Sequence, residues 1–190
     1  MSSKDEASRA RAAWRIGAGA PSPAGREPSP LVLFLCRSNT AASIMAEAIC
    51  EHYARECVRA ASAGDVPAVH VNPYALECLR GHGVATRGLR SKPWGEFFGL
   101  YRAPVRFVIS LGDVEASKSN WDHSNSVALK ARWWMPDPGS VSASDINIRL
   151  AFEDAFGTLQ SRIRKFLALP LDRLADQALT RELALIGQEP

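Results

Sequence analysis

The chain has 190 residues, a formal net charge of +3 and four cysteines. A hydrophobic content of 46% and a charged content of 23% are ordinary for a soluble globular protein, and the length suits one domain rather than two. The basic residues are scattered rather than clustered, which argues against a nucleic-acid partner. No apolar run approaches the roughly 20 residues that span a bilayer, and the N-terminus has no stretch typical of a signal peptide. We therefore expect a cytoplasmic protein without a membrane partner.

The two ends of the chain differ in composition from its middle. Residues 1–30 are rich in Ala, Ser, Gly, Pro and Arg, and such a segment buries too little apolar surface to offset the entropy lost on ordering. We predict a disordered tail over 1–30 and one folded domain over 31–170. Residues 171–190 have a helical composition and are expected to form a loosely packed helical tail.

Short apolar runs mark the expected strands. Residues 31–35 read LVLFL, and five consecutive apolar residues favour a strand that is buried on both faces, as in a parallel sheet. Further strands are expected over 58–61 and 105–111, and a weaker one over 126–130. Apolar residues at helical spacing predict a helix from Met45 to about residue 57, and Asn72-Pro73 opens another that runs through Leu79.

The longest helix is expected near the C-terminus. Ser142 and Asp145 have the spacing of a capping box, and Pro170 ends the helix. Its apolar face comprises Ile148, Phe152, Phe156, Leu159, Ile163 and Phe166. Its solvated face is expected to carry Arg149, Arg162, Arg164 and Lys165.

Strands that alternate with helices predict an α/β fold. We expect a Rossmann-like three-layer sandwich of about four parallel strands flanked by helices. In such sheets ligands bind beyond the carboxyl ends of the strands. The loop after the first strand is therefore the first candidate site.

That loop has the composition of an anion-binding turn. A tight turn of small and polar residues between a strand and a helix directs backbone N–H groups to one point, at the positive end of the helix dipole. A cysteine at its rim, Cys36, would have its thiolate stabilised and its pKa lowered. Asn39 and Ser43 are expected to brace the loop or the sulfur. The candidate oxyanion-binding residues are Arg37, Ser38, Asn39, Thr40, Ala41, Ala42 and Ser43.

Several motifs in the chain occur in the same order as in one known family. They are LFLC ending at Cys36, Asn39, Ser43, MAEA at 45–48, SAG at 62–64, SKP at 91–93, and PDP at 136–138 after Trp133. Together they resemble the low-molecular-weight protein tyrosine phosphatases and the related arsenate reductases, over residues 31 to about 168. The resemblance implies Cys36 as nucleophile and Asp137 as general acid. It also implies phosphate, arsenate or a phosphorylated substrate as the partner, and no cofactor.

The chain departs from the family pattern at two places. Ala42 stands where the family has the arginine that clamps the oxyanion, and alanine cannot replace a bidentate guanidinium. The neighbouring Arg37 is expected to point outward. Thioredoxin-coupled reductases of the family use a cysteine pair after the third strand, whereas residues 110–117 contain no cysteine.

Three functions remain open from the sequence. The first is a phosphotyrosine phosphatase-like hydrolase, and the second is a single-cysteine arsenate reductase that uses an external thiol. The third is a catalytically degenerate module that binds an oxyanion or a phosphoprotein. Whether the chain is an enzyme therefore depends on the effect of Ala42. The four histidines share no H-x-x-x-H spacing, so no metal ligand is assigned.

Overall fold

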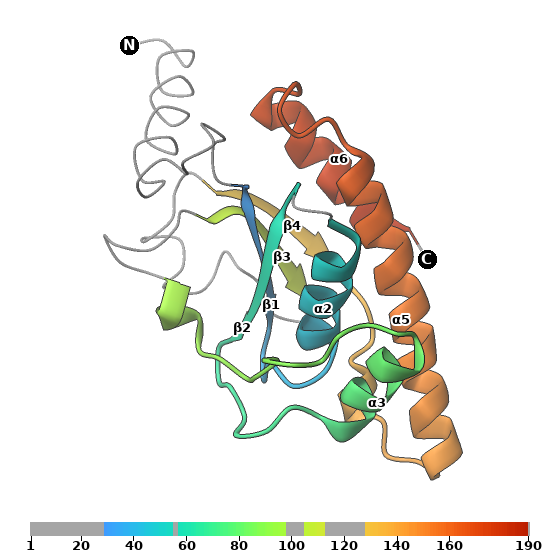
Figure 1. Ribbon diagram of the computed structural model, residues 1–190. Coiled ribbons are helices and arrows are strands. Elements are labelled where there is room, and N and C mark those ends of the chain that lie inside the picture. Colours follow the sequence, from blue (N-terminus) through green and yellow to red (C-terminus); the bar gives the residue numbers. More distant parts are fainter. Residues whose placement is uncertain (1–28, 55–56, 98–104, 113–127, 190) are drawn as a thin grey trace.

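The computed structural model describes residues 29–54, 57–97, 105–112 and 128–189. The predicted N-terminal tail lies almost entirely outside these ranges. Four strands form one parallel sheet in the order β2-β1-β3-β4 (Figure 1). They are β1 (Leu31–Cys36), β2 (Arg59–Gly64), β3 (Val105–Leu111) and β4 (Leu129–Trp133). The α/β Rossmann-like fold predicted from the sequence is confirmed.

The helices pack mainly on one face of the sheet (Figure 1). They are α2 (Ala42–Ala54), α3 (Pro73–Gly81), α5 (Asp145–Ala168) and α6 (Asp176–Gln188), with the short 3₁₀ helices η1 (Trp94–Phe97) and η2 (Pro138–Ser140). The opposite face of the sheet has a smaller apolar cluster, against which Trp94 and Phe97 of η1 pack. Within the described ranges, η1 therefore forms the third layer of the sandwich, on the face of the sheet opposite the α-helices.

Strand β1 is buried on both faces, as its unbroken apolar run predicted. Val32 and Phe34 belong to the larger cluster under the helices, and Leu33 and Leu35 belong to the smaller cluster on the other face. Because both faces are covered, side chains that alternate across the strand are all apolar. This central strand carries Cys36 to the carboxyl edge of the sheet.

The fourth strand lies three residues later than predicted. It was expected over 126–130, but the structure has it at Leu129–Trp133, and residues 126–127 lie outside the described ranges. β4 is an edge strand of the sheet, and most of its residues are only partly buried. Leu129, Ala131 and Trp133 contact the helix-side cluster, while Lys130 and Arg132 alternate with them. Because apolar and polar side chains alternate along β4, a search for continuous apolar runs does not detect the strand.

The start of α5 also differs from the expectation. The helix begins at Asp145 with Ser144 as its N-cap, and the N-cap side chain makes no capping hydrogen bond. The predicted capping box of Ser142 and Asp145 is therefore wrong. Asp145 instead accepts a hydrogen bond from the hydroxyl of Tyr74, which ties α5 to α3, and another from Arg149 of its own helix.

The C-terminal segment is a packed part of the fold. Leu179, Leu183 and Ile186 of α6 are buried in the helix-side cluster, and the carbonyl of Leu183 accepts a hydrogen bond from Nε1 of Trp133. The expectation of loose packing is wrong, because α6 covers the edge strand β4. Arg162 was expected in solvent but is also buried, where it donates to the carbonyl of Trp134.

Candidate active site at the loop after the first strand

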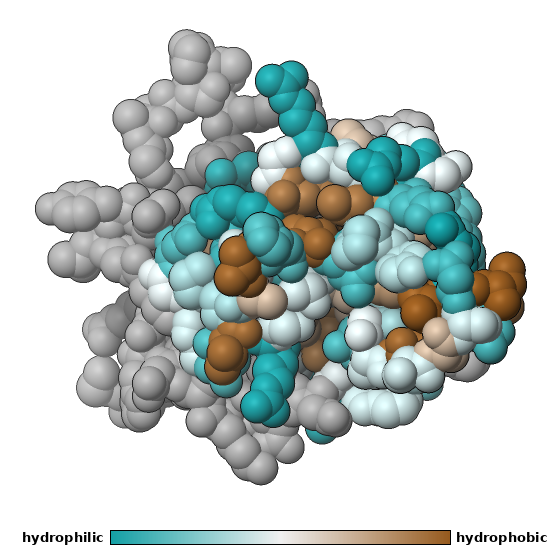
Figure 2. Space-filling view, turned by 90° about the horizontal axis from the view of Figure 1, so that it is seen from below, coloured by the Kyte–Doolittle hydropathy of each residue, from teal (hydrophilic) through white to brown (hydrophobic). Residues whose placement is uncertain are grey.

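The candidate loop lies at the carboxyl edge of the sheet, the edge that faces the viewer in Figure 2. β1 ends at Cys36 and α2 begins at Ala42, so the turn between them has five residues, 37–41. The first turn of α2 contains no acidic side chain that would oppose a bound anion. This is the strand-to-helix geometry from which the anion-binding turn was predicted.

The carbonyl groups of the loop are engaged by the segment that follows β2. The carbonyls of Cys36, Arg37 and Ser38 accept hydrogen bonds from the N–H groups of Asp65, Val66 and Ala68. That of Thr40 accepts from the N–H of Asn72 at 2.9 Å. These acceptors are turned toward the neighbouring segment, whereas the N–H of Asn39 is directed at the sulfur of Cys36.

The sulfur of Cys36 has one hydrogen-bond partner in the loop and another in the first turn of α2. The backbone N–H of Asn39 donates to Sγ at 3.1 Å, and Oγ of Ser43 lies 2.8 Å from it. Both contacts lower the pKa of Cys36. Burial of the sulfur raises it by more, and the negative charge of Asp137 raises it further. The net result is that the pKa of Cys36 lies above its ordinary value, opposite to the direction predicted from the loop alone.

Asn39 is the residue that fixes the shape of the loop. Its φ of 51° places it in the left-handed region, and its side chain is fully buried. Nδ2 donates to the hydroxyls of Ser43 and Ser62, and Oδ1 accepts from the N–H of Lys92 at 2.7 Å. A side chain with all these partners stabilises a backbone conformation that a non-glycine residue rarely adopts.

Gly64 allows the loop to approach the end of β2. A Cβ atom at this position would lie 2.9 Å from the carbonyl oxygen of Arg37 and 3.0 Å from Cβ of Asn39. Only a residue without a side chain fits between the strand and the loop. This close approach lets the 65–72 segment reach the loop carbonyls.

Behind the loop lies a buried ion pair. Nζ of Lys92 is 2.8 Å from Oε2 of Glu47, and their side chains are 8% and 15% exposed. The carboxylate of Glu47 also accepts from the hydroxyl of Ser62, which is itself bonded to Asn39. The ion pair therefore connects α2 and the 91–93 segment to the residue that shapes the loop.

The segment that contains Asp137 packs against the same loop. Oδ1 of Asp137 accepts from the N–H of Gly139 and caps η2. A Cβ atom at Gly139 would lie 3.4 Å from Cβ of Ala41, so η2 is in contact with the cysteine loop. Asp137 is exposed, and its charge acts on the pKa of Cys36. The structure thus brings Cys36 and Asp137, 101 positions apart in the sequence, to one site.

Comparison with known proteins agrees with this geometry. Residues 31–183 match the family model described as low molecular weight phosphotyrosine protein phosphatase. The chain belongs to this family. None of the curated proteins compared matches the chain.

Solved structures similar to this family member include several arsenate reductases. A thioredoxin-dependent arsenate reductase of Corynebacterium glutamicum is 25% identical over 82% of this chain and 67% of its own, with a TM-score of 0.50. An arsenate reductase in the phosphate-binding state is 23% identical over 73% of this chain and 97% of its own, with a TM-score of 0.59. An arsenate reductase of Archaeoglobus fulgidus is 20% identical over 70% of this chain and 98% of its own, with a TM-score of 0.52. The last two, at these identities, support the fold alone.

Ala42, where the sequence resemblance implies an arginine in the family, is the first residue of α2 and only 5% exposed. The neighbouring Arg37 is exposed. Both hydrogen bonds to the Cys36 sulfur come from uncharged groups, Asn39 and Ser43. Ser38 and Thr40 are half-buried, with their hydroxyls 3.0 Å apart.

The structure adds Glu47, Ser62, Gly64 and Lys92 to the site. All four fall within motifs that carry the family resemblance, but sequence reasoning gave them no role. The structure shows a role for each. Ser62 and Lys92 bond to Asn39, Glu47 bonds to Ser62, and Gly64 makes room for the loop.

The tryptophans and the other cysteines also have defined places. Trp133 is fully buried, whereas Trp134, three residues before Asp137, is 54% exposed. All four cysteines are free thiols, and burial raises the pKa of Cys50 to about 12. Among the helices in the described ranges, none is both long and apolar enough to span a bilayer.

Proposed function

We propose that this chain is a cysteine-dependent phosphate-monoester hydrolase of the phosphotyrosine phosphatase type. The observation that carries the proposal is the position of the Cys36 sulfur. It lies at the end of β1, receives the N–H of Asn39, and lies in a loop whose carbonyls are turned toward the 65–72 segment. A sulfur nucleophile inside an anion-binding turn is the arrangement that attack on a phosphate ester needs.

The reaction has two steps that use the residues of this site. The thiolate of Cys36 attacks phosphorus, the bond to the leaving oxygen breaks, and Asp137 gives that oxygen a proton. Water then attacks the thiophosphate, Asp137 takes a proton from the water, and phosphate leaves with the thiolate restored. The hydrogen bonds from Ser43 and Asn39 favour the thiolate that begins and ends the cycle.

The rim of the site favours an apolar or aromatic ester group. Val66 is 63% exposed and Val69 is 87% exposed, and both belong to the segment that bonds the loop carbonyls. In Figure 2 apolar side chains lie among hydrophilic ones on this face of the molecule. An aryl phosphate is therefore the substrate class to test first.

Hydrolysis of an aryl phosphate tests the proposal. The parent protein should turn over slowly, Cys36→Ser should have no activity, and Asp137→Asn should lose about 10²-fold or more in rate with a poor leaving group, as expected for a lost general acid. Asp154→Asn, a substitution on the exposed face of α5, is the control and should keep full activity. Turnover that persists in Cys36→Ser would exclude the cysteine mechanism.

An oxyanion-binding module is the second candidate, and Ala42 is the observation that favours it. Without the guanidinium, and with the pKa of Cys36 raised, the loop has the amides to bind an oxyanion but a weakened nucleophile. A parent protein that binds inorganic phosphate in calorimetry, with binding retained in Cys36→Ser and no turnover, would support this reading over hydrolysis.

An arsenate reductase is the third candidate, supported by the SKP motif at 91–93 and by the arsenate reductases among the similar structures. With no cysteine at 110–117, the oxidised sulfur would need an external thiol as reductant. Arsenite formation from arsenate that requires both Cys36 and a small thiol such as glutathione would establish this activity. Arsenate and phosphate should compete for the loop in either case.

A further inference from the structure

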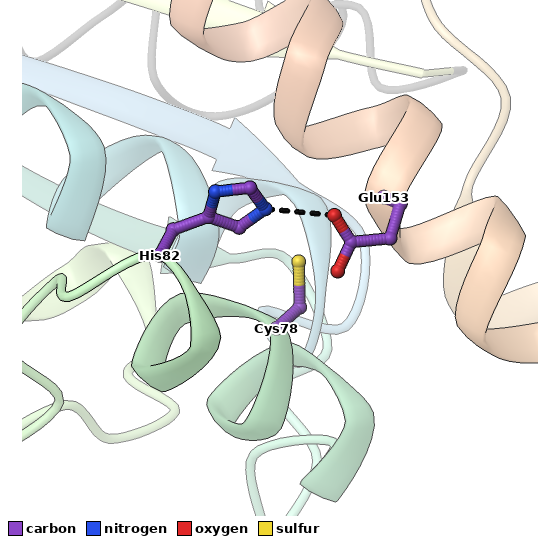
Figure 3. A group of neighbouring side chains, drawn as sticks. All are labelled: Cys78, His82 and Glu153. Carbon is purple, nitrogen blue, oxygen red and sulfur yellow. Dashed lines mark hydrogen bonds and ion pairs between the residues drawn. The ribbon is translucent and has the colours of Figure 1, made fainter.

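A second group of reactive side chains lies where α3 meets α5. Cys78 lies on α3, His82 is the residue that caps the C-terminus of that helix, and Glu153 lies on α5. One potential ligand atom from each side chain lies within 4.8 Å of the other two. Figure 3 shows the three side chains directed toward one another across the junction of the two helices.

The three side chains are already positioned by their neighbours. Nε2 of His82 lies 2.7 Å from Oε2 of Glu153, and the imidazole ring stacks on Phe156 with 3.8 Å between ring centroids. The sulfur of Cys78 is buried and donates to the carbonyl of Phe152 at 3.6 Å. The thiol is therefore fixed at the base of the group, while the imidazole and the carboxylate are half-exposed above it.

Thiolate, imidazole and carboxylate together are ligands typical of Zn²⁺. We propose that Cys78, His82 and Glu153 bind one Zn²⁺ ion, with water in the fourth position. The bond lengths of a tetrahedral zinc site place its ligand atoms roughly 3.3–3.8 Å apart. Atoms that lie within 4.8 Å reach this spacing through small rotations of the exposed His82 and Glu153 side chains.

Zinc binding changes the protonation of the group in a defined way. The thiol of Cys78 loses its proton to solvent, and the metal takes the place of the hydrogen bond between His82 and Glu153. Without metal, burial and the charge of Glu153 raise the pKa of Cys78 to about 12. The cation offsets both effects, because it stabilises the thiolate and neutralises the carboxylate beside it.

The proposed zinc site is independent of the phosphatase proposal, since none of its ligands belongs to the cysteine loop. A bound ion would cross-link α3 to α5. It would raise the melting temperature of the protein with zinc concentration, because the ligands come together only in the folded chain. The alternative is a buried structural thiol beside a surface histidine–glutamate pair, and the experiment below distinguishes the two.

The test is a titration of the full-length, tag-free protein in a Cys36→Ser, Cys57→Ser background. These two changes remove the loop thiol and the exposed thiol, which would otherwise compete for the metal. Calorimetry with Zn²⁺ should give one site per chain. Co²⁺ in its place should give a sulfur-to-cobalt charge-transfer band, which reports the thiolate ligand directly.

Single substitutions identify the ligands. Glu153→Gln should weaken zinc binding by about tenfold or more, the loss that even an outer partner of a ligand can cause, and Cys78→Ser should abolish the cobalt band. Asp154→Asn is the matched control, because Asp154 is the exposed neighbour of Glu153 on α5, and it should leave the affinity unchanged. Glu153 is exposed, so its substitution tests the site without disturbing the core.

Two results would overturn the proposal. One is the absence of saturable zinc binding in the background protein. The other is a cobalt band or zinc affinity that Cys78→Ser and Glu153→Gln leave unchanged, which would place the metal elsewhere. Circular dichroism shows whether Cys78→Ser is folded. If it is not, the titration of Glu153→Gln decides whether the proposed ligands bind the metal.

Discussion

The amine of Lys92 lies 2.8 Å from Oε2 of Glu47, and this nearly buried ion pair lies directly behind the cysteine loop. The carboxylate also accepts from Ser62, and the backbone of Lys92 donates to Asn39. The pair therefore supports the residue whose left-handed backbone gives the loop its shape. The shape of the loop therefore depends on the charged side chain of Lys92, which lies far from the loop in the sequence.

Removal of that amine should destabilise the protein. Lys92→Met leaves the carboxylate of Glu47 buried without its partner, a change that costs about 3 kcal/mol or more in the free energy of unfolding. Urea denaturation measures the loss. Glu47→Gln in the same chain should recover part of it, since the uncompensated charge is then gone.

The exposed ion pair between Arg90 and Glu96 provides the control. Arg90→Gln should change stability by less than about 1 kcal/mol, because solvent screens a pair at the surface. A Lys92→Met variant as stable as Arg90→Gln would contradict the role given to the buried pair.

The hydroxyl of Ser43 should control the acidity of Cys36. Its hydrogen bond lowers the pKa of the thiol, so Ser43→Ala should raise that pKa further. A hydrogen bond to a charged group is stronger than one to a neutral group, so its loss disfavours the thiolate. The alkylation rate of Cys36 as a function of pH, followed by mass spectrometry of its peptide, measures the shift.

Ser38→Ala is the matched control for this experiment. The hydroxyl of Ser38 lies 3.0 Å from that of Thr40 in the same loop, but it is not among the hydrogen-bond partners of the sulfur. The pH profile of Cys36 should therefore stay the same in this variant. Equal shifts in the two variants would mean that loop shape, and not the Ser43 bond, sets the pKa.

Local sequence was sufficient to predict β1 and the cysteine loop. The run LVLFL has one physical explanation, burial on both faces, and the polar turn after it follows at once in the chain. The direction of the Cys36 pKa was not predictable in this way. It depends on how deeply the sulfur is buried, and burial is set by tertiary packing that a local sequence pattern does not report.

Contacts between distant segments were beyond the reach of sequence patterns. Lys92 and Glu47 are 45 residues apart, and neither carries a local signal of burial. Cys78 and His82 have the i, i+4 spacing of a pair on one helix face, but a search for paired histidines misses them. Glu153, 71 residues after His82, joins them only because α3 packs on α5.

Substitution by alanine should change the stability of the protein in opposite directions at two helical glycines. A Cβ atom at Gly187 of α6 would overlap the carbonyl oxygen of Arg132 in β4, whereas at Gly157 of α5 it would meet nothing within 4 Å. Gly187→Ala should lower stability by about 1–3 kcal/mol, as overpacking does. Gly157→Ala should raise it by about 0.5–1 kcal/mol through helix propensity.

Thermal and urea unfolding of the two variants test whether α6 is part of the fold. A loss in Gly187→Ala requires that α6 be docked on β4 in solution, as the buried Leu183 also indicates. If both glycine variants gain stability, α6 is detached from the sheet and the packing described above does not hold in solution.

Restoration of the family's arginine should increase activity. In Ala42→Arg the guanidinium can bind two oxygens of the transferring phosphoryl group, and we expect kcat/KM for an aryl phosphate to rise by about 10²-fold or more. The same cation should lower the pKa of Cys36, since a positive charge favours the thiolate. Phosphate should also become a tighter competitive inhibitor.

Ala42→Met separates this charge effect from a change in volume. Ala42 is only 5% exposed, so a long side chain at this position is accommodated only if it extends out of the core and over the loop. Methionine has comparable length but no charge, and it should leave both kcat/KM and phosphate affinity near the parent values. If arginine and methionine behave alike, the side chain at position 42 does not reach the oxyanion. The low reactivity expected of Cys36 would then arise from its burial, and a second substitution that opens the site would be needed to increase activity.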